Sequence, residues 1–296
     1  MGDWSKIFKE INESQSQYDY IRRKYISDLS KITKRNVITY YSGWLSKQNA
    51  ANTDINDSDM DGFMNCVHEL DCSKGLDLIL HTPGGSPNAA EAIVNYLRDK
   101  FKKDIRVIVP QLAMSAGTMM ACASKTIIMG KQSSLGPIDP QFNGIPAYNI
   151  KSEFEEAKND LLNNPANAQY WAIKLQQYPA AFMKTAIDAI ELSGTLVKEW
   201  LGTCMYDKKT DKRIINRIVS KLNEHDKSKV HGRHFNADFC KEIGLKIEMM
   251  EDNNALQDAI LSIHHAYMIT FSGTNAIKII ENQNQKSFIS LTNFKN

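Results

Sequence analysis

The chain has 296 residues, of which 42% are hydrophobic and 24% are charged, a composition that favours a folded globular protein over a disordered chain or a coiled coil. Its 36 basic and 34 acidic residues give a net charge of +2, so charge provides no case for nucleic acid as a partner. The five cysteines form no CxxC pair, which favours reduced packing thiols over disulfides or zinc ligands.

No part of the sequence resembles a membrane or export signal. The residues that follow Met1 lack the charged region and apolar core of a signal peptide, and no window approaches 18 uninterrupted apolar residues. We therefore expect a cytoplasmic protein without a membrane span.

The first half of the chain alternates between helical and strand patterns. Residues 4–33 carry apolar side chains at three- and four-residue intervals, which predicts an N-terminal amphipathic helix within residues 1–34. Strands are then predicted at 36–45, 76–80, 105–109 and 126–129, and helices at 58–71, 87–101 and 115–123. This alternation predicts an α/β fold with a mostly parallel sheet covered on both faces.

The pattern becomes mainly helical after residue 150. Helices are predicted at 151–163, 167–176, 179–191, 193–202 and 210–222, a short strand at 244–248 and a helix at 256–271. The Asn-, Gln- and Lys-rich tail beyond about 282 is expected to fray or to pack on a neighbour. We therefore expect a main domain over 35–250 with a helical insertion at about 151–222, followed by a C-terminal helix and tail over 251–296.

Two glycine-rich turns, each between a strand and a helix, carry the predicted chemistry. The first is His81-Thr82-Pro83-Gly84-Gly85-Ser86 and the second is Ala113-Met114-Ser115-Ala116-Gly117-Thr118. Acyl transfer needs a nucleophile and backbone N–H groups that stabilise the developing oxyanion. Ser115 is the candidate nucleophile, and the N–H groups of Gly85 and Ala116 are the candidate donors. A lone serine before Ala-Gly is more often a helix N-cap than a nucleophile, and it is the pairing of the two turns that favours catalysis.

Several stretches together resemble a known family. They are residues 35–45, the whole of 76–142 including Gly136-Pro137-Ile138-Asp139-Pro140-Gln141, Gly232-Arg233-His234 and His264-His265-Ala266-Tyr267. In these stretches the chain resembles the serine dehydrogenase proteinase family, in the signal peptide peptidase A-like branch of the Clp protease/crotonase superfamily. The resemblance implies a ββα superhelix, a serine nucleophile matching Ser115, oxyanion donors matching Gly85 and Ala116, and a homo-oligomer.

The residue that would activate Ser115 is less evident. Asp139 stands where the resemblance to the Clp branch leads us to expect a histidine, whereas the lysine-dyad branch places its base in a helix 40 to 50 residues after the serine. Lys158 is our candidate base, because Ala157 and two leucines suggest apolar surroundings, and Lys151 is the runner-up. The alternative is that both are solvated helix lysines.

Other candidates rank below these. His81 is expected to be structural, and His231 with His234 lacks a visible third metal ligand, so we predict no metal. A glycine-rich GxGxxG fingerprint is missing, and we predict no cofactor.

The sequence therefore predicts a cytoplasmic serine peptidase that acts on a peptide or protein substrate through Ser115 and a lysine. Two alternatives remain. One is crotonase-like chemistry on an acyl thioester, which the same fold and oxyanion hole would support. The other is a catalytically silent oligomeric scaffold, which the replacement at Asp139 favours.

Overall fold

A seven-stranded sheet forms the centre of the protein. The computed structural model describes residues 4–13, 17–223 and 232–292. The strand order is β10-β5-β3-β2-β1-β11-β12, in which β10, β5, β3, β2 and β1 run parallel and β11 and β12 are antiparallel to their neighbours. The bounds are β1 Asn36–Ser42, β2 Leu76–His81, β3 Ile105–Val109, β5 Thr126–Met129, β10 Ile247–Met249, β11 Ala276–Asn282 and β12 Ser287–Leu291. The predicted α/β class with a mostly parallel sheet is confirmed.

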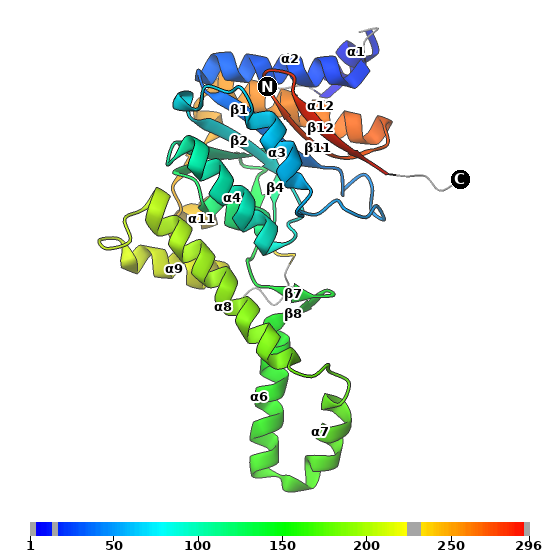
Figure 1. The fold of residues 1–296 in the computed structure, drawn as a ribbon, viewed down its shortest axis with the longest axis vertical. Coiled ribbons are helices and arrows are strands. Elements are labelled where there is room, and N and C mark those ends of the chain that lie inside the picture. The colour runs from blue at the N-terminus through cyan, green and yellow to red at the C-terminus, as the bar shows by residue number, and fades with distance from the viewer. Residues whose placement is uncertain (1–3, 14–16, 224–231, 293–296) are drawn as a thin grey trace.

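Helices cover both faces of this sheet (Figure 1). α2 (Gln17–Thr33) and α12 (Asn254–Gly273) pack on one face, and α3 (Asp59–Val67), α4 (Pro87–Phe101) and α5 (Ala116–Cys122) pack on the other. Successive side chains of a strand point to opposite faces. In β1, Val37 and Tyr41 accordingly join the α2–α12 core while Ile38 and Tyr40 join the α3–α5 core.

The N-terminal region contains two helices where the periodicity predicted one. α1 spans Trp4–Glu13 and α2 begins at Gln17. The apolar residues Ile7, Ile11 and Ile21 form a separate small core with α12. The apolar period therefore identifies buried residues in each helix, but it also includes the exposed Phe8 and Ile32, and it does not reveal where one helix ends and the next begins.

Shorter elements complete the fold. They are the 3-10 turns Cys72–Lys74, Pro165–Asn167 and Met250–Asp252, the strands β4 Leu112–Ala113, β6 Ser134–Leu135 and β9 Phe235–Asn236 in a second sheet, the hairpin β7 Gln141–Phe142 with β8 Ile145–Pro146, and α11 Ala237–Ile243. Within the described ranges, no helix has the length and apolarity needed to cross a lipid bilayer.

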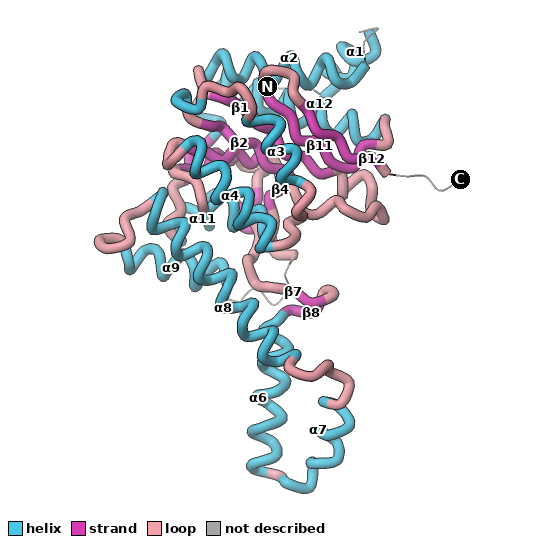
Figure 2. The backbone as a smooth tube through the Cα atoms, viewed as in Figure 1, coloured by secondary structure: helices cyan, strands magenta, loops and turns pink. Residues whose placement is uncertain are grey.

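A helical arm projects from the sheet (Figures 1 and 2). It consists of α6 (Ala147–Asn163), α7 (Ala168–Leu175) and the first part of α8 (Phe182–Trp200). A small core of Ala147, Ile150 and Ala186, flanked by aromatic side chains, joins α6 to α8. α8 continues through the predicted break near residue 192 and ends in a π-helical turn at Leu201–Met205, and α9 (Lys212–Asn223) then returns along the body.

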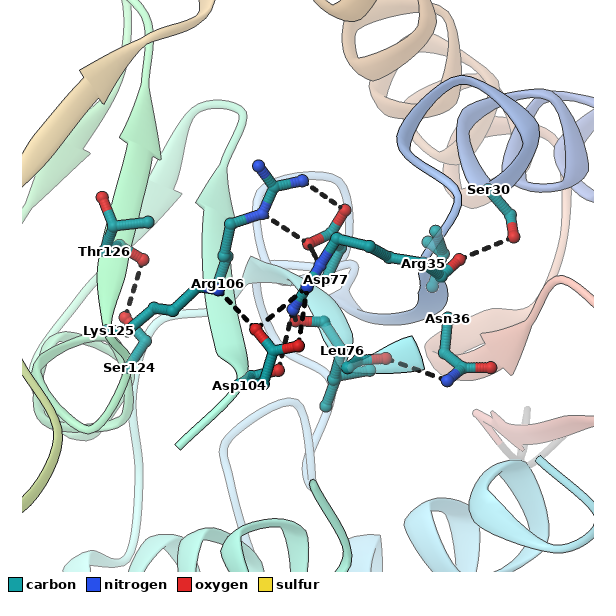
Figure 3. A network of polar contacts seen from close by, with 12 residues as sticks. Ser30, Arg35, Asn36, Leu76, Asp77, Asp104, Arg106, Ser124, Lys125 and Thr126 are labelled. Carbon is teal, nitrogen blue, oxygen red and sulfur yellow. Dashed lines mark hydrogen bonds and ion pairs between the residues drawn. The ribbon is translucent and has the colours of Figure 1, made fainter. Parts of the chain in front are cut away.

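Charged side chains brace the amino-terminal ends of the parallel strands (Figure 3). The buried Asp77 of β2 accepts hydrogen bonds from Arg35 Nε at 2.8 Å and from Arg106 Nε and Nη2 at 2.8 and 2.7 Å. Arg35 also pairs with Asp104, which pairs in turn with Lys125. Because these residues precede or begin four different strands, β1, β2, β3 and β5, the network fixes that edge of the sheet and leaves the opposite edge for the two glycine-rich turns.

The tail up to residue 292 forms a hairpin, which corrects the first part of the prediction that residues beyond about 282 fray or pack on a neighbour. β11 lies against β1 and β12 lies outside β11. The Asn-, Gln- and Lys-rich segment is the turn between these strands: Asn282 is buried, and its side-chain amide donates to Cys66 O at 2.6 Å. The polar composition therefore belongs to an ordered turn and to the end of β11, whose last residue is Asn282.

Candidate active site

The two glycine-rich turns lie side by side at the carboxyl ends of β2 and β3. β2 and β3 are parallel neighbours, so the segments that follow them emerge at the same edge of the sheet. Backbone hydrogen bonds join the segments directly: Thr82 N–H donates to Leu112 O and Met114 N–H donates to Thr82 O, both at 3.0 Å. The structure thus brings together the two turns that the sequence singled out.

Gly84 packs directly against the candidate nucleophile. A Cβ atom at Gly84 would lie 2.7 Å from Ser115 Cβ and 3.2 Å from Ala116 N, and Gly84 has a φ of +99°. Both the close approach and the positive φ require glycine. The backbone of the first turn therefore lies directly beside Ser115, with no side chain between them.

Ser115 has a backbone conformation that is uncommon for serine. Its φ is 51° and its ψ is −115°, and α5 begins at the next residue. It occupies the N-cap position, but its hydroxyl makes no capping hydrogen bond, so helix capping does not account for the residue. Such backbone strain costs of order 1–3 kcal/mol and persists where the surroundings impose it, often at functional sites. The side chain is half-buried.

Gly85 is held from one side by Ile55, a contact that the sequence did not predict. Ile55 N–H donates to Gly84 O, and Ser86 N–H donates to Ile55 O, both at 2.8 Å. In a parallel bridge of this kind, the N–H of Gly85, which lies between the bonded Gly84 and Ser86, points away from Ile55. Among the described residues, no acceptor is recorded for the N–H groups of Gly85 and Ala116. Neither N–H group is therefore used by a hydrogen bond among these residues; Gly85 is exposed, and Ala116 is buried at the start of α5.

Thr118 ties the serine turn to the following loop. Its hydroxyl donates to Ala113 O at 2.9 Å and accepts from Gly136 N–H at 2.9 Å. A Cβ at Gly136 would lie 2.7 Å from Met114 Cε, so this loop packs on the serine turn. Asp139, three residues further on, is buried. The segment 136–141, one of those that carry the family resemblance, thus lies next to the site.

The two candidate bases lie on α6 in the arm. Lys158 is exposed, which corrects the expectation of apolar surroundings: Ile150 and Ala157 form the buried face, and Lys158 lies one residue further round the helix. The side chain of Lys151 is 41% exposed and forms an ion pair with Glu155 at 3.7 Å. No contact of either lysine with Ser115 is recorded among the described residues, so the role of base remains a prediction.

The buried His81 belongs to an aromatic cluster behind the site. Its ring lies 4.4 Å from Trp44, 5.5 Å from Tyr41 and 5.1 Å from His264, measured between centroids. Burial lowers the pKa of His81 well below its ordinary value, and it lowers the pKa of His264 to about 3. Both imidazoles are therefore neutral at physiological pH.

No group of three or more His, Cys, Asp or Glu side chains in the described part of the chain is arranged to hold a metal ion. Of the two histidines weighed as metal ligands, His231 lies outside the described residues.

Comparisons with known proteins connect this site to a family. Residues 14–167, just over half of the chain, match the family of ClpP-like SDH-type serine proteinases. Two relatives from Methanocaldococcus jannaschii are similar: Uncharacterized protein MJ0137 is 33% identical over 53% of this chain and 57% of its own length, and Uncharacterized protein MJ1495 is 45% identical over 25% of each. The chain therefore spans about half, or less, of the relatives it matches.

A solved structure is also similar. It is a variant of the membrane-bound stomatin-specific protease 1510-N, with a TM-score of 0.42 and 17% identity over 69% of this chain and 78% of that chain. The family match includes both glycine-rich turns, Ser115 and the strands β1, β2, β3 and β5. The chain belongs to the ClpP-like SDH-type serine proteinase family.

Proposed function

We propose that this protein hydrolyses peptide bonds with Ser115 as the nucleophile and the N–H groups of Gly85 and Ala116 as the oxyanion hole. The observation that carries the proposal is the packing of Gly84 against Ser115, with two N–H groups beside it that have no acceptor among the described residues. A preorganised pair of N–H donors stabilises the charge that develops on a carbonyl oxygen under attack.

The reaction takes two steps. Ser115 Oγ attacks the carbonyl carbon of the peptide bond while the base accepts the hydroxyl proton, and the base then gives that proton to the departing amine. The acyl group remains on Ser115 until water, which gives a proton to the same base, attacks the acyl carbon. The bond from that carbon to Ser115 Oγ then breaks, the base returns the proton to Oγ, and the acid product leaves. In both steps the negative oxygen is stabilised by the Gly85 and Ala116 donors.

We assign the base to α6, with Lys158 as the first candidate and Lys151 as the second. An ammonium group loses its proton readily only when apolar surroundings exclude water. Both lysines are at least partly exposed, so the active form requires that this face of α6 be covered.

We propose that a second copy of the chain covers this face of α6, because the arm also exposes Leu162, Tyr170 and Ile173 at 73%, 57% and 60%. We further propose that the active protein is a cytoplasmic homo-oligomer.

Replacement of the nucleophile tests the proposed function. We expect Ser115→Ala to abolish hydrolysis of casein or of a fluorogenic peptide library, and to abolish covalent labelling by a fluorophosphonate. The matched control is Ser272→Ala, which removes an exposed hydroxyl at the end of α12 and should leave both readouts unchanged.

Three outcomes separate the hypotheses. Hydrolysis that persists in Ser115→Ala would exclude Ser115 as the nucleophile. Turnover of an acyl thioester, with peptides left intact, would favour the crotonase-like alternative. A wild-type protein that neither hydrolyses peptides nor reacts with the fluorophosphonate in any oligomeric state would favour the silent scaffold.

A further inference from the structure

Lys278 is a buried lysine far from Ser115 in sequence. It lies in β11 and is 1% exposed, and its Nζ donates to Asp59 Oδ1 at 2.7 Å and to Asp54 O at 2.6 Å. Asp59, in the first turn of α3, is fully buried. Taking two charges out of water costs more than an isolated ion pair generally returns in stability. The pair therefore calls for an explanation besides stability.

The Lys278–Asp59 pair fixes the backbone of the segment 54–56. Lys278 binds the carbonyl at the start of this segment, and Asp59 Oδ2 accepts from Asn56 N–H at 3.0 Å at its end. The same carboxylate oxygen accepts from Tyr40 OH at 2.8 Å. Ile55, between these two anchors, is fully buried. The segment is thus held at both ends by one buried ion pair.

Ile55 in turn holds the turn that carries the candidate oxyanion donor. Its N–H and C=O bind Gly84 O and Ser86 N–H, and a Cβ at Gly85 would overlap the Ile55 backbone. A second path leads through Tyr40, whose side chain interacts with Thr82, and the Thr82 hydroxyl accepts from Gly84 N–H at 3.1 Å. Both paths lead from the ion pair to residues 82–86.

We propose that Lys278 and Asp59 are positioning residues that set the orientation of the Gly85 N–H relative to Ser115. The inference rests on the proposed function, because it concerns the same oxyanion hole. Lys278 lies outside the residues 14–167 that match the family, so this part of the site is contributed by the C-terminal hairpin.

A double variant tests the positioning role. Lys278→Met alone leaves Asp59 charged and buried, and this single variant can fail to fold. Lys278→Met with Asp59→Leu removes both charges at similar volume and should fold. We expect its kcat for peptide hydrolysis to fall about 10- to 100-fold with KM within about twofold, as for a misplaced transition-state contact. The matched control is Lys286→Met, in the turn of the same hairpin, which loses a surface ion pair with Glu69 and a hydrogen bond to His68 O.

Hydrogen exchange measures the same effect without relying on activity. In the double variant the amides of Ile55 and Ser86 should exchange at least about tenfold faster, while those of Val107 and Ile127 in the central strands should be unchanged. Unchanged exchange at Ile55 and Ser86 would overturn the inference, and so would equal acceleration throughout the sheet, which would indicate a stability role alone. Unchanged kcat in a folded, active double variant would also overturn it.

The two readouts separate failure of this inference from failure of the proposed function. A wild-type protein without Ser115-dependent hydrolysis would overturn the proposed function, and exchange at Ile55 and Ser86 would still decide whether the pair fixes the turn.

Discussion

At the scale of single residues, the contact between Gly84 and Ser115 defines the candidate site. The contact needs a residue without a side chain at position 84 and a strained backbone at position 115. Both are requirements on backbone geometry, and this explains why the pairing of the two glycine-rich turns could be predicted from the sequence. Glycine and proline indicate local backbone geometry directly, and the strand pattern places the two turns at one edge.

Gly84→Ala should abolish hydrolysis. The added Cβ collides with Ser115, and alanine is strained at a φ of +99°, so we also expect a loss of unfolding free energy of roughly 1–3 kcal/mol. The matched control is Gly144→Ala in the β7–β8 turn, where φ is +82° but no atom lies within 4 Å of an added Cβ. Activity assays and urea unfolding of both variants separate collision from strain. Hydrolysis that survives in Gly84→Ala would contradict the packing described here.

At the scale of elements, the arm carries the part of the site that the sequence determined least. Lys151 and Lys158 are seven residues apart in α6, which places them on one face of the helix, next to the face that buries Ile150 and Ala157. Helical periodicity identifies which residues share a face, but the solvent exposure of that face depends on what packs against it. Desolvation of a lysine therefore could not be predicted from its neighbours in sequence.

Replacement of the arm lysines distinguishes the two candidate bases. If Lys158 is the base, Lys158→Met should lower kcat by at least about 100-fold, as loss of a general base does, while Lys151→Met should retain most of the activity. The control is Lys184→Met, an exposed arm lysine paired with Asp188. The reverse result would assign the role to Lys151. Full activity in both variants would exclude α6 as the source of the base.

The C-terminal hairpin shows where composition misleads. The sequence predicted β2, β3 and β5 because buried parallel strands are nearly continuous apolar runs. β11 includes Lys278, Glu281 and Asn282, all buried and all hydrogen-bonded, so its composition resembles that of a polar loop. Asp59, the partner of Lys278, and Cys66, the partner of Asn282, each lie more than 200 residues away in the sequence. Such long-range pairing is invisible to local patterns.

At the scale of the whole molecule, two neutral histidines are buried against one face of the sheet. His81 and His264 lie in a cluster with Tyr41 and Trp44, under the cover of α12. Because burial lowers both pKa values, the folded state binds protons more weakly than the unfolded chain, whose histidines have a pKa near 6.5. Their contribution to stability is complete above pH 6.5 and decreases as the pH falls towards the folded-state values.

Acid should therefore destabilise the protein well before its carboxylates titrate. With a folded-state pKa of about 3 for His264, this residue alone lowers the free energy of unfolding by about 2 kcal/mol at pH 5 relative to neutral pH. Urea unfolding between pH 7.5 and 5 should show this slope. His264→Phe should reduce it, and His68→Gln, at an exposed position, should not. An identical slope in wild type and His264→Phe would contradict the assignment.

The pairing of β1 with β11 bears on when the site can form during synthesis. β1 is among the first strands to leave the ribosome and β11 is the sixth in the seven-stranded sheet by chain order, so one edge of β1 stays open until nearly the whole described chain has emerged. Contacts between distant segments form late because closing a long loop is slow. Until β11 docks, Asp59 has no Lys278 beside it, and the segment 54–56 lacks its contact with Lys278. Under the proposed function, a nascent chain would gain a fully supported Ser115 site only after β11 has docked, late in folding, which would protect the unfinished core from cleavage by the protein itself.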